Sequence, residues 1–290
     1  MGIKVENLTV KIKNRVILNN LNFEIPTGTF SVFVGENGSG KTTTIKSILG
    51  LQQSKYTNVT LMGKNARDYR AREQVAYMPD DQEFLAISPR TWLIEQNAYY
   101  GISKTEVNKR IDVLAKKLNF PEKELNSKLN KLSAGLKKLI LIINVFVSER
   151  ELIIMDEPTE FLDPIMRNNF FKVAAEYQKR GTTFFVSTHN LDEIEKYANH
   201  LTVIKDAKIA FSGYWNNSTT SMRRRYELFY KTGDMNYFTK TISLTNEQRY
   251  RKLLKNNHIN EKEFEMLMKD INARKEAKKT FVLVEENQDK

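Results

Sequence analysis

Hydrophobic and polar positions along the chain fall into short strand-like stretches with helical stretches between them. The first two stretches, 4–10 and 16–23, are separated by a turn around Lys13, which favours antiparallel pairing. The runs at 151–155 and 182–187 are typical of buried strands in a parallel sheet. The expected strands are 4–10, 16–23, 30–34, 59–62, 75–78, 151–155, 182–187, 201–204 and 208–211.

Helical spacing of apolar residues becomes clear after Arg90. Ser103 and Glu106 form a capping box, and the apolar positions that follow recur at helical spacing, so one face of that helix is expected to be buried. Another helix is expected to begin at Pro164 and to end at Gly181. The buried face consists of Val107, Ile111, Leu114 and Leu118, and the other expected helices cover 43–49 and 140–147. Strands interleaved with helices predict an α/β fold.

The segment from Gly35 to Thr42 fits the pattern G-x-x-x-x-G-K-[ST] between an expected strand and an expected helix. Its glycines let successive backbone N–H groups surround an anion, and the helix N-terminus adds the positive end of its dipole. Lys41 is expected to reach the β- and γ-phosphates of a nucleotide, and the Thr42 hydroxyl to bind magnesium. The expected nucleotide-binding residues are Gly35, Glu36, Asn37, Gly38, Ser39, Gly40, Lys41, Thr42 and Thr43.

Two acidic residues follow the apolar strand that ends at Met155. An open α/β sheet places its ligand site at the carboxyl ends of its strands. Asp156 is expected to hold magnesium through water, because that ion prefers oxygen ligands and keeps several of its own waters. Glu157 is expected to activate the attacking water as a general base. Acidic pairs are common at strand ends, so it is the nearby phosphate loop that favours this interpretation.

Composition narrows the classes of partner. The 290 residues are 40% hydrophobic, which predicts a globular chain, and they contain no cysteine, which excludes disulfides and thiolate metal sites and agrees with a reducing cytosol. The longest apolar run, 139–147, is too short to span a bilayer, and no signal peptide is expected. A net charge of +11 favours an anionic partner, which leaves nucleic acid, an anionic lipid surface and nucleotide open.

Over roughly residues 3–213 the chain resembles the ATP-binding subunits of ABC transporters, because several motifs of that family occur in the right order. Gly35–Thr42 matches the Walker A motif, and 152–157 matches Walker B with its catalytic glutamate. The segment 132–136 is similar to the signature motif, with Ala134 and Leu136 in place of a usual glycine and its glutamine. Phe161, Leu162 and Asp163 match the D-loop, His189 matches the switch histidine, and 77–79 with 91–95 looks most like the ABC-2 type exporter branch.

The resemblance implies a site shared between two chains. Ser133, Ala134 and Gly135 would contact the γ-phosphate of ATP bound to a second ATPase subunit, in a homo- or heterodimer with ATP sandwiched between the subunits. His189 would contact the γ-phosphate and position the water. The family's glutamine near magnesium is replaced by Asp80, whose oxygen can also serve as a ligand; Gln82 remains the alternative.

The aromatic residue that stacks on adenine in this family would lie near Ile12, where no aromatic occurs. Stacking of a base on an aromatic side chain contributes about 1–3 kcal/mol in nucleic-acid binders. We therefore expect weak selectivity between ATP and GTP.

The resemblance implies a P-loop NTPase core of the ABC type at 1–213, with an antiparallel β-subdomain and a helical subdomain at about 84–148. A small accessory domain is expected at 214–290; its helix starts are expected at Thr245 and Asn260, and a strand at 281–284. The three arginines at 223–225 would meet lipid headgroups or an acidic partner, or form a solvated face.

The implied activity is hydrolysis of ATP to ADP and phosphate with Mg²⁺, coupled to export through a separate transmembrane permease subunit. The protein would lie peripherally at the cytoplasmic face of the membrane and would not bind nucleic acid; peptides or drugs are the suggested cargo. The alternatives are a soluble ABC-type ATPase acting on ribosomes or nucleic acid, which the charge of +11 would suit, and a regulatory module with a silent site, against which Glu157 and His189 argue.

Overall fold

The computed structural model describes residues 1–215, 221–234, 236–239, 261, 265 and 269. The chain divides into two compact units. The first contains Met1–Asn190 and Lys196–Trp215, and the second contains Leu191–Glu195 together with the chain beyond Trp215. The short segment 191–195 therefore groups with the second unit, although it precedes the boundary that we expect from the sequence, between residues 213 and 214.

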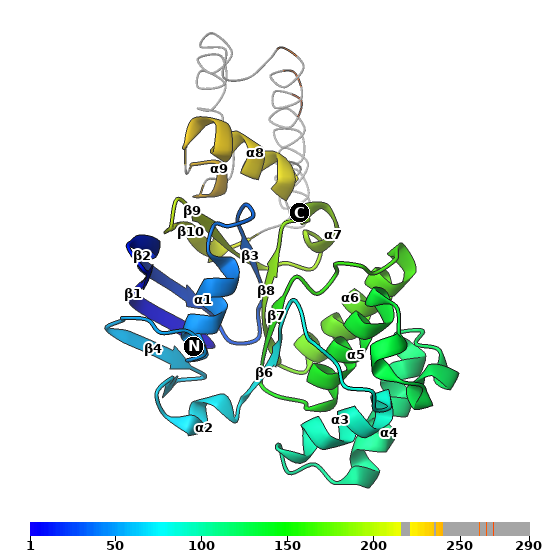
Figure 1. The fold of residues 1–290 in the computed structure, drawn as a ribbon. Helices are drawn as coiled ribbons and strands as arrows, with labels where there is room; N and C mark the ends of the chain where they lie inside the picture. Colours follow the sequence, from blue (N-terminus) through cyan, green and yellow to red (C-terminus); the bar gives the residue numbers. More distant parts are fainter. Residues whose placement is uncertain (216–220, 235, 240–260, 262–264, 266–268, 270–290) are drawn as a thin grey trace, which may run out of the picture. The chain divides into compact units, whose positions relative to one another are not determined.

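The N-terminal strands form an antiparallel sheet in the order β2-β1-β4-β5 (Figure 1). Strand β1 pairs antiparallel with both β2 and β4, which confirms the pairing expected from the first two stretches. The connecting turn contains Lys13, whose φ is +53°. The strands are β1 (Ile3–Ile12), β2 (Arg15–Ile25), β4 (Asn58–Leu61) and β5 (Lys64–Asn65).

A second sheet of six strands carries the order β10-β9-β3-β8-β7-β6. Strands β6, β7, β8, β3 and β9 are parallel neighbours, and β10 turns back antiparallel to β9. Because β3, β8 and β7 are adjacent and parallel, the residues that follow them gather at one edge of the sheet. The strands are β3 (Phe30–Val34), β6 (Val75–Met78), β7 (Leu152–Asp156), β8 (Thr183–Thr188), β9 (His200–Lys205) and β10 (Lys208–Tyr214).

The helices of the first unit confirm the expected caps. The Ser103 hydroxyl accepts a hydrogen bond from the Glu106 N–H at the start of α4, and the face expected to be buried is buried. Helix α5 begins at Ala134, earlier than the expected 140, because the Ser133 side chain caps it. The helices are α1 (Lys41–Ile48), α2 (Tyr69–Arg72), α3 (Pro89–Ala98), α4 (Lys104–Lys117), α5 (Ala134–Val147) and α6 (Pro164–Lys179), with the short 3₁₀ helices η1 (Glu122–Asn126) and η2 (Leu129–Lys131).

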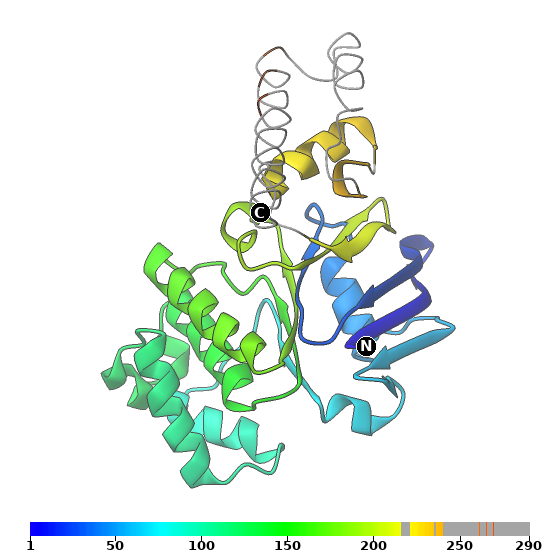
Figure 2. The ribbon, with the colours of Figure 1, turned by 180° about the vertical axis from the view of Figure 1, so that it is seen from behind.

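Helices α3, α4 and α5 pack on one another, and the two views place them on the side of the six-stranded sheet away from β1 and β2 (Figures 1 and 2). Between the two sheets the core is rich in stacked aromatic rings. The rings of Phe33 on β3 and Phe185 on β8 lie 5.1 Å apart, and Phe23 on β2 stacks on Phe185 at 5.9 Å. This core joins the sheets and fixes the carboxyl ends of β3 and β8 beside each other.

The second unit contains α7 (Leu191–Ile194), α8 (Met222–Thr232) and α9 (Asn236–Thr239). Of the three arginines at 223–225, Arg225 is buried and donates to the Tyr237 carbonyl, whereas Arg223 pairs with Asp192 and Glu227. The triplet is therefore not a uniform solvated face. The helix starts expected at Thr245 and Asn260 and the strand expected at 281–284 lie outside the described residues.

Candidate active site

The loop between β3 and α1 depends on glycine at two positions. Gly40 has a φ of +105°, and a Cβ placed there would lie 2.5 Å from the Leu18 side chain. A Cβ on Gly35 would lie 2.8 Å from the main-chain oxygen of Ile204. The chain can make this turn only because no side chain occupies either position, so the loop presents its backbone to a ligand.

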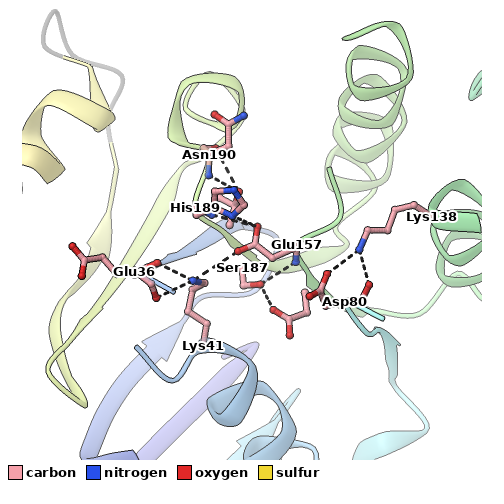
Figure 3. Close-up of polar contacts among 11 residues, drawn as sticks. Glu36, Lys41, Asp80, Lys138, Glu157, Ser187, His189 and Asn190 are labelled. Carbon is pink, nitrogen blue, oxygen red and sulfur yellow. Dashed lines mark hydrogen bonds and ion pairs between the residues drawn. The ribbon is translucent and has the colours of Figure 1, made fainter. Parts of the chain in front are cut away.

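Lys41, the first residue of α1, lies across this loop with its side chain almost fully buried. Its ammonium donates to the carbonyl of Gly35 at 2.8 Å and to that of Glu36 at 3.3 Å (Figure 3). The same Nζ lies 3.8 Å from Oε1 of Glu157. The structure thus brings the expected phosphate-binding lysine and the expected general base together from separate elements.

Asp156 ends β7 and is fully buried. Its Oδ1 accepts a hydrogen bond from the hydroxyl of Ser187 on the neighbouring strand β8. Its Oδ2 is buried and has no hydrogen-bond partner among the described residues. A buried carboxylate oxygen without a partner is costly, and a hydrated cation supplies the missing contact. This orphan oxygen fits the expected magnesium role.

Glu157 is held in a specific conformation just beyond β7. Its φ is +47°, and its N–H donates to the Ser187 hydroxyl at 3.1 Å. Its Oε2 accepts the backbone N–H of His189 at 3.3 Å and lies 3.0 Å from the Nδ1 of the same histidine. Figure 3 shows the two side chains turned toward each other from the ends of β7 and β8. The carboxylate is therefore fixed between Lys41 and His189.

Asp80 follows β6 and meets a lysine that sequence reasoning did not single out. The Lys138 ammonium, from α5, donates to the Asp80 main-chain oxygen at 2.7 Å and to its Oδ1 at 3.1 Å. The Lys138 side chain is 3% exposed and that of Asp80 44% exposed. Glu160 lies near them: burial and the negative charge of Asp80 raise the pKa of its carboxyl. No sequence motif marks Lys138 or Glu160, so only the fold could identify them.

These residues surround a cavity of about 350 Å³. Asp80 lines it and also lines a second cavity of about 550 Å³; Gln82, the alternative near magnesium, lines only the second. Ile17 on β2 contributes an apolar wall that the sequence did not indicate; Ile12 is not part of the lining. The lining residues are Ile17, Asn37, Gly38, Gly40, Lys41, Thr42, Thr43, Asp80, Glu157, Glu160 and His189.

Within the described residues, no group of three or more histidine and acidic side chains forms a ready metal cage. Magnesium does not need one in a phosphate site, because substrate phosphates and water supply most of its ligands. The side chains available here are the Thr42 hydroxyl, which is exposed in the cavity, and the carboxylates of Asp156 and Asp80.

The expected signature residues lie elsewhere. Ser133 caps α5 by accepting the Leu136 N–H at 3.4 Å, and both Ser133 and Ala134 are exposed. None of the three residues 133–135 lines the cavity around Lys41. Gly135 faces the segment after β7: a Cβ on it would lie 2.8 Å from the main-chain oxygen of Phe161. The N-terminus of α5 at Ser133 can therefore contact a ligand that is bound outside this cavity.

The arrangement combines a backbone anion cradle, a buried ammonium, a carboxylate with an unsatisfied oxygen, and a second carboxylate oriented by a histidine. Phosphoryl transfer needs mainly positioning and charge stabilisation, together with a base that orients the nucleophile. The site therefore suits hydrolysis of a phosphoanhydride.

Comparison with known proteins agrees with this interpretation. A family model described as "ABC transporter" matches residues 18–160. The chain is 34% identical over 207 residues to a putative ABC transporter ATP-binding protein of Mycoplasma pneumoniae, covering 71% of this chain but only 63% of that relative. It is 31% identical to the energy-coupling factor transporter ATP-binding protein EcfA of Methanococcus maripaludis, with 68% of this chain and 73% of EcfA covered.

A further relative, the Nod factor export ATP-binding protein I of Burkholderia lata, is 27% identical, with 71% of this chain and 68% of that protein covered. Among solved structures, an ATP-binding subunit of an ABC transporter superposes with a TM-score of 0.70 at 24% identity, covering 87% of this chain and 99% of that one. The likeness at this identity concerns the fold, and it matches the two-sheet arrangement described above.

Proposed function

This chain belongs to the ABC transporter family of ATP-binding proteins, and we propose that it is the ATP-hydrolysing subunit of an exporter whose membrane-spanning part is a separate protein. One observation carries the proposal for hydrolysis. The Glu157 carboxylate is held between Lys41 and His189 at the edge of the sheet, where a phosphate bound by the loop would lie.

Each residue has a distinct part in the proposed reaction, ATP plus water to ADP plus phosphate. The loop at 35–40 and Lys41 bind the β- and γ-phosphates, and Glu157 accepts the proton of the attacking water. His189 keeps the Glu157 carboxylate oriented and contacts the γ-phosphate. Thr42 and Asp156 would hold magnesium, with Asp80 as a third candidate. The ion would neutralise negative charge on the phosphates.

We further propose that two such subunits are needed for one complete site. Ser133, Ala134 and Gly135 lie outside the cavity around Lys41, and the exposed N-terminus of α5 offers free N–H groups to a phosphate. A second subunit, identical or related, would supply these residues to the ATP bound here. ATP would then join the subunits, and hydrolysis would let them separate.

A surface groove of the first unit supports a protein partner. A cavity of about 360 Å³ lies between α1, β6 and α3, and its margin includes Leu51 and Tyr99, which are 62% and 88% exposed. Large exposed apolar side chains beside a groove are typical of a docking surface. We propose that a helix of the membrane subunit docks here. The other lining residues are Leu49, Arg72, Val75, Tyr77, Gln96, Tyr100 and Asn144.

Among the described residues, none of the helices combines the length and the apolar character that crossing a membrane requires. The proposed location, at the cytoplasmic face of a membrane, therefore depends on the partner.

The direction and the cargo of transport belong to this proposal as well. The resemblance of 77–79 and 91–95 to the ABC-2 type branch favours export, and one relative is named for Nod factor export. Another relative is named for an energy-coupling factor transporter, so the relatives do not share one named task. Peptides or drugs remain the suggested cargo. A soluble ATPase acting on ribosomes or nucleic acid is not favoured, because these relatives carry transporter names.

The test is recovery of tagged protein from detergent-solubilised native membranes, followed by ATPase assays of the wild type and of Glu157→Gln. We expect a multi-span protein to be recovered with both forms and hydrolysis to be lost only in the variant. Recovery with ribosomes or nucleic acid, and without a multi-span protein, would contradict the transport function while leaving the nucleotide site intact.

A further inference from the structure

Three carboxylates line the cavity that would receive a highly anionic ligand. They belong to Asp80, Glu157 and Glu160. Each carboxylate that keeps its charge near the phosphates repels them. Glu157 has Lys41 at 3.8 Å as a counter-charge. Asp80 also needs a counter-charge, because it is an anion at a position where the family that this chain resembles has an uncharged glutamine.

Lys138 provides that counter-charge from a different part of the fold. It lies one turn inside α5, and its ammonium contacts Asp80 twice, through the main-chain oxygen at 2.7 Å and through Oδ1 at 3.1 Å. The lysine side chain is 3% exposed. A lysine is seldom buried so deeply unless it is paired, and the double contact fixes both the backbone and the carboxylate of Asp80.

We propose that Lys138 is a positioning residue of the nucleotide site, which holds Asp80 at the wall of the cavity and cancels the charge that Asp80 would otherwise place beside the phosphates. The inference rests on the proposed function, because it assumes that the cavity binds MgATP. Lys138 is not itself among the residues that line the cavity, and both of its hydrogen bonds go to Asp80, which does line it, so Lys138 acts through Asp80.

The helix that carries Lys138 gives the contact a second role. Helix α5 begins at Ala134, directly after Ser133, so Asp80 is tied to the same rigid element that presents the signature residues. The loop after β6 and the N-terminus of α5 are thereby fixed in one arrangement. A change in the position of Asp80 when nucleotide binds is passed to α5 through Lys138.

The experiment measures the Kd of the purified full chain for Mg²⁺ with a non-hydrolysable ATP analogue, at low and at high salt. For Lys138→Gln we expect the Kd to rise about tenfold at low salt and the difference to shrink at high salt, because the uncompensated charge of Asp80 is then screened. Lys138→Arg should bind like the wild type. In an Asp80→Asn background, which sets its own reference Kd, the added Lys138→Gln should raise the Kd far less than tenfold, because the charge that Lys138 neutralises is then absent.

The matched control is Lys137→Gln, which removes the same charge from the neighbouring residue of α5, whereas the hydrogen bonds to Asp80 come from Lys138. Its Kd should stay unchanged. Circular dichroism establishes that each variant is folded. If Lys138→Gln does not fold, the comparison of Asp80→Asn with the double variant still decides the matter, since the two must bind the analogue alike and unequal Kd values would contradict the inference.

The inference is overturned if Lys138→Gln binds like the wild type, if Lys137→Gln is equally weakened, or if Lys138→Gln weakens binding as much in the Asp80→Asn background as in the wild type. The proposed function fails in a different way. Wild-type protein that binds the analogue with this pattern of variants but does not hydrolyse ATP contradicts the ATPase proposal alone. Wild-type protein that hydrolyses ATP and is indifferent to Lys138→Gln contradicts the present inference alone.

Discussion

The Nδ1 atom of His189 lies 3.0 Å from Oε2 of Glu157, and the backbone N–H of the same histidine donates to that oxygen at 3.3 Å. Two contacts to one oxygen leave Oε1 of Glu157 directed toward Lys41, which is 3.8 Å away. The proposed general base is thus held in a defined orientation, with Oε1 on the side of the phosphate-binding lysine.

Glu157→Gln should abolish most hydrolysis and leave nucleotide binding intact. The amide keeps the size and one acceptor oxygen but cannot take a proton from water, and general-base catalysis contributes about 100- to 10,000-fold to rate. We expect kcat to fall within that range while the Kd for MgATP changes less than about threefold. Single-turnover assays and equilibrium binding measure the two quantities.

Glu151→Gln is the control for that substitution, because Glu151 lies just before β7, at the end of the strand opposite to Glu157. It should hydrolyse ATP like the wild type. A Glu157→Gln protein with near-normal turnover would show that another group activates the water.

Gly40→Ala should destabilise the protein more than Gly38→Ala does. Both glycines have positive φ, but a Cβ on Gly40 would lie 2.5 Å from Leu18, whereas a Cβ on Gly38 meets nothing within 4 Å. Positive φ alone costs an alanine about 1–2 kcal/mol, and the overlap with Leu18 adds to this at position 40. Urea unfolding of the two variants gives the difference in free energy of unfolding. Equal losses would mean that the loop relaxes around the new side chain.

ATP and GTP should bind with Kd values within about threefold of each other, because among the described residues no aromatic ring lines the cavity and Ile17 supplies only an apolar wall. Competition between the two nucleotides at equilibrium measures this ratio. Ile12→Tyr, at an exposed position, should tighten the binding of both nucleotides. A strong preference of the wild type for ATP would contradict the prediction and would indicate polar contacts to the adenine edge.

Stability should fall as the pH is lowered from about 6.5 to about 4. Burial lowers the pKa of His200 from its ordinary 6.5 to about 4, and its Nδ1 lies 2.9 Å from the buried Ser31 hydroxyl. Between these two pH values the unfolded chain binds a proton that the folded chain excludes, so the free energy of unfolding decreases toward low pH. The slope is about 1.4 kcal/mol per pH unit, or roughly 3 kcal/mol in total.

His200→Asn removes the titrating group and keeps a polar atom near Ser31, so its stability should depend less on pH in that window. Ser31→Ala is the matched control, because it keeps the buried His200 ring and removes only the hydroxyl 2.9 Å from its Nδ1, and it should keep the wild-type slope. Urea unfolding at pH 7 and pH 5 compares the three proteins. Equal slopes in all of them would show that another group causes the loss.

Sequence patterns predicted the parts of this protein that local chemistry determines. Apolar runs mark the strands of the parallel sheet, and the pattern G-x-x-x-x-G-K-[ST] marks the loop that contains Gly40. The start of α5 was missed because a glycine and two lysines, Gly135, Lys137 and Lys138, precede its continuous apolar run, and its cap, Ser133, is recognisable only beside the helix. Ile17 lines the cavity from β2, and Lys138 on α5 meets Asp80, which lies 58 residues before it in the chain. No periodicity records such meetings.

The close approach of Gly135 to the carbonyl of Phe161 has a consequence for an assembled pair. Phe161 lies four residues after Glu157, so the main chain that carries one subunit's own base rests against the segment that would cover its neighbour's nucleotide. Neither stretch can shift alone without opening a gap. Two subunits joined head to tail would therefore hydrolyse ATP cooperatively. The rate of turnover should depend on ATP concentration more steeply than for independent sites, and substitution of Glu157 in one subunit should slow hydrolysis in the intact partner as well.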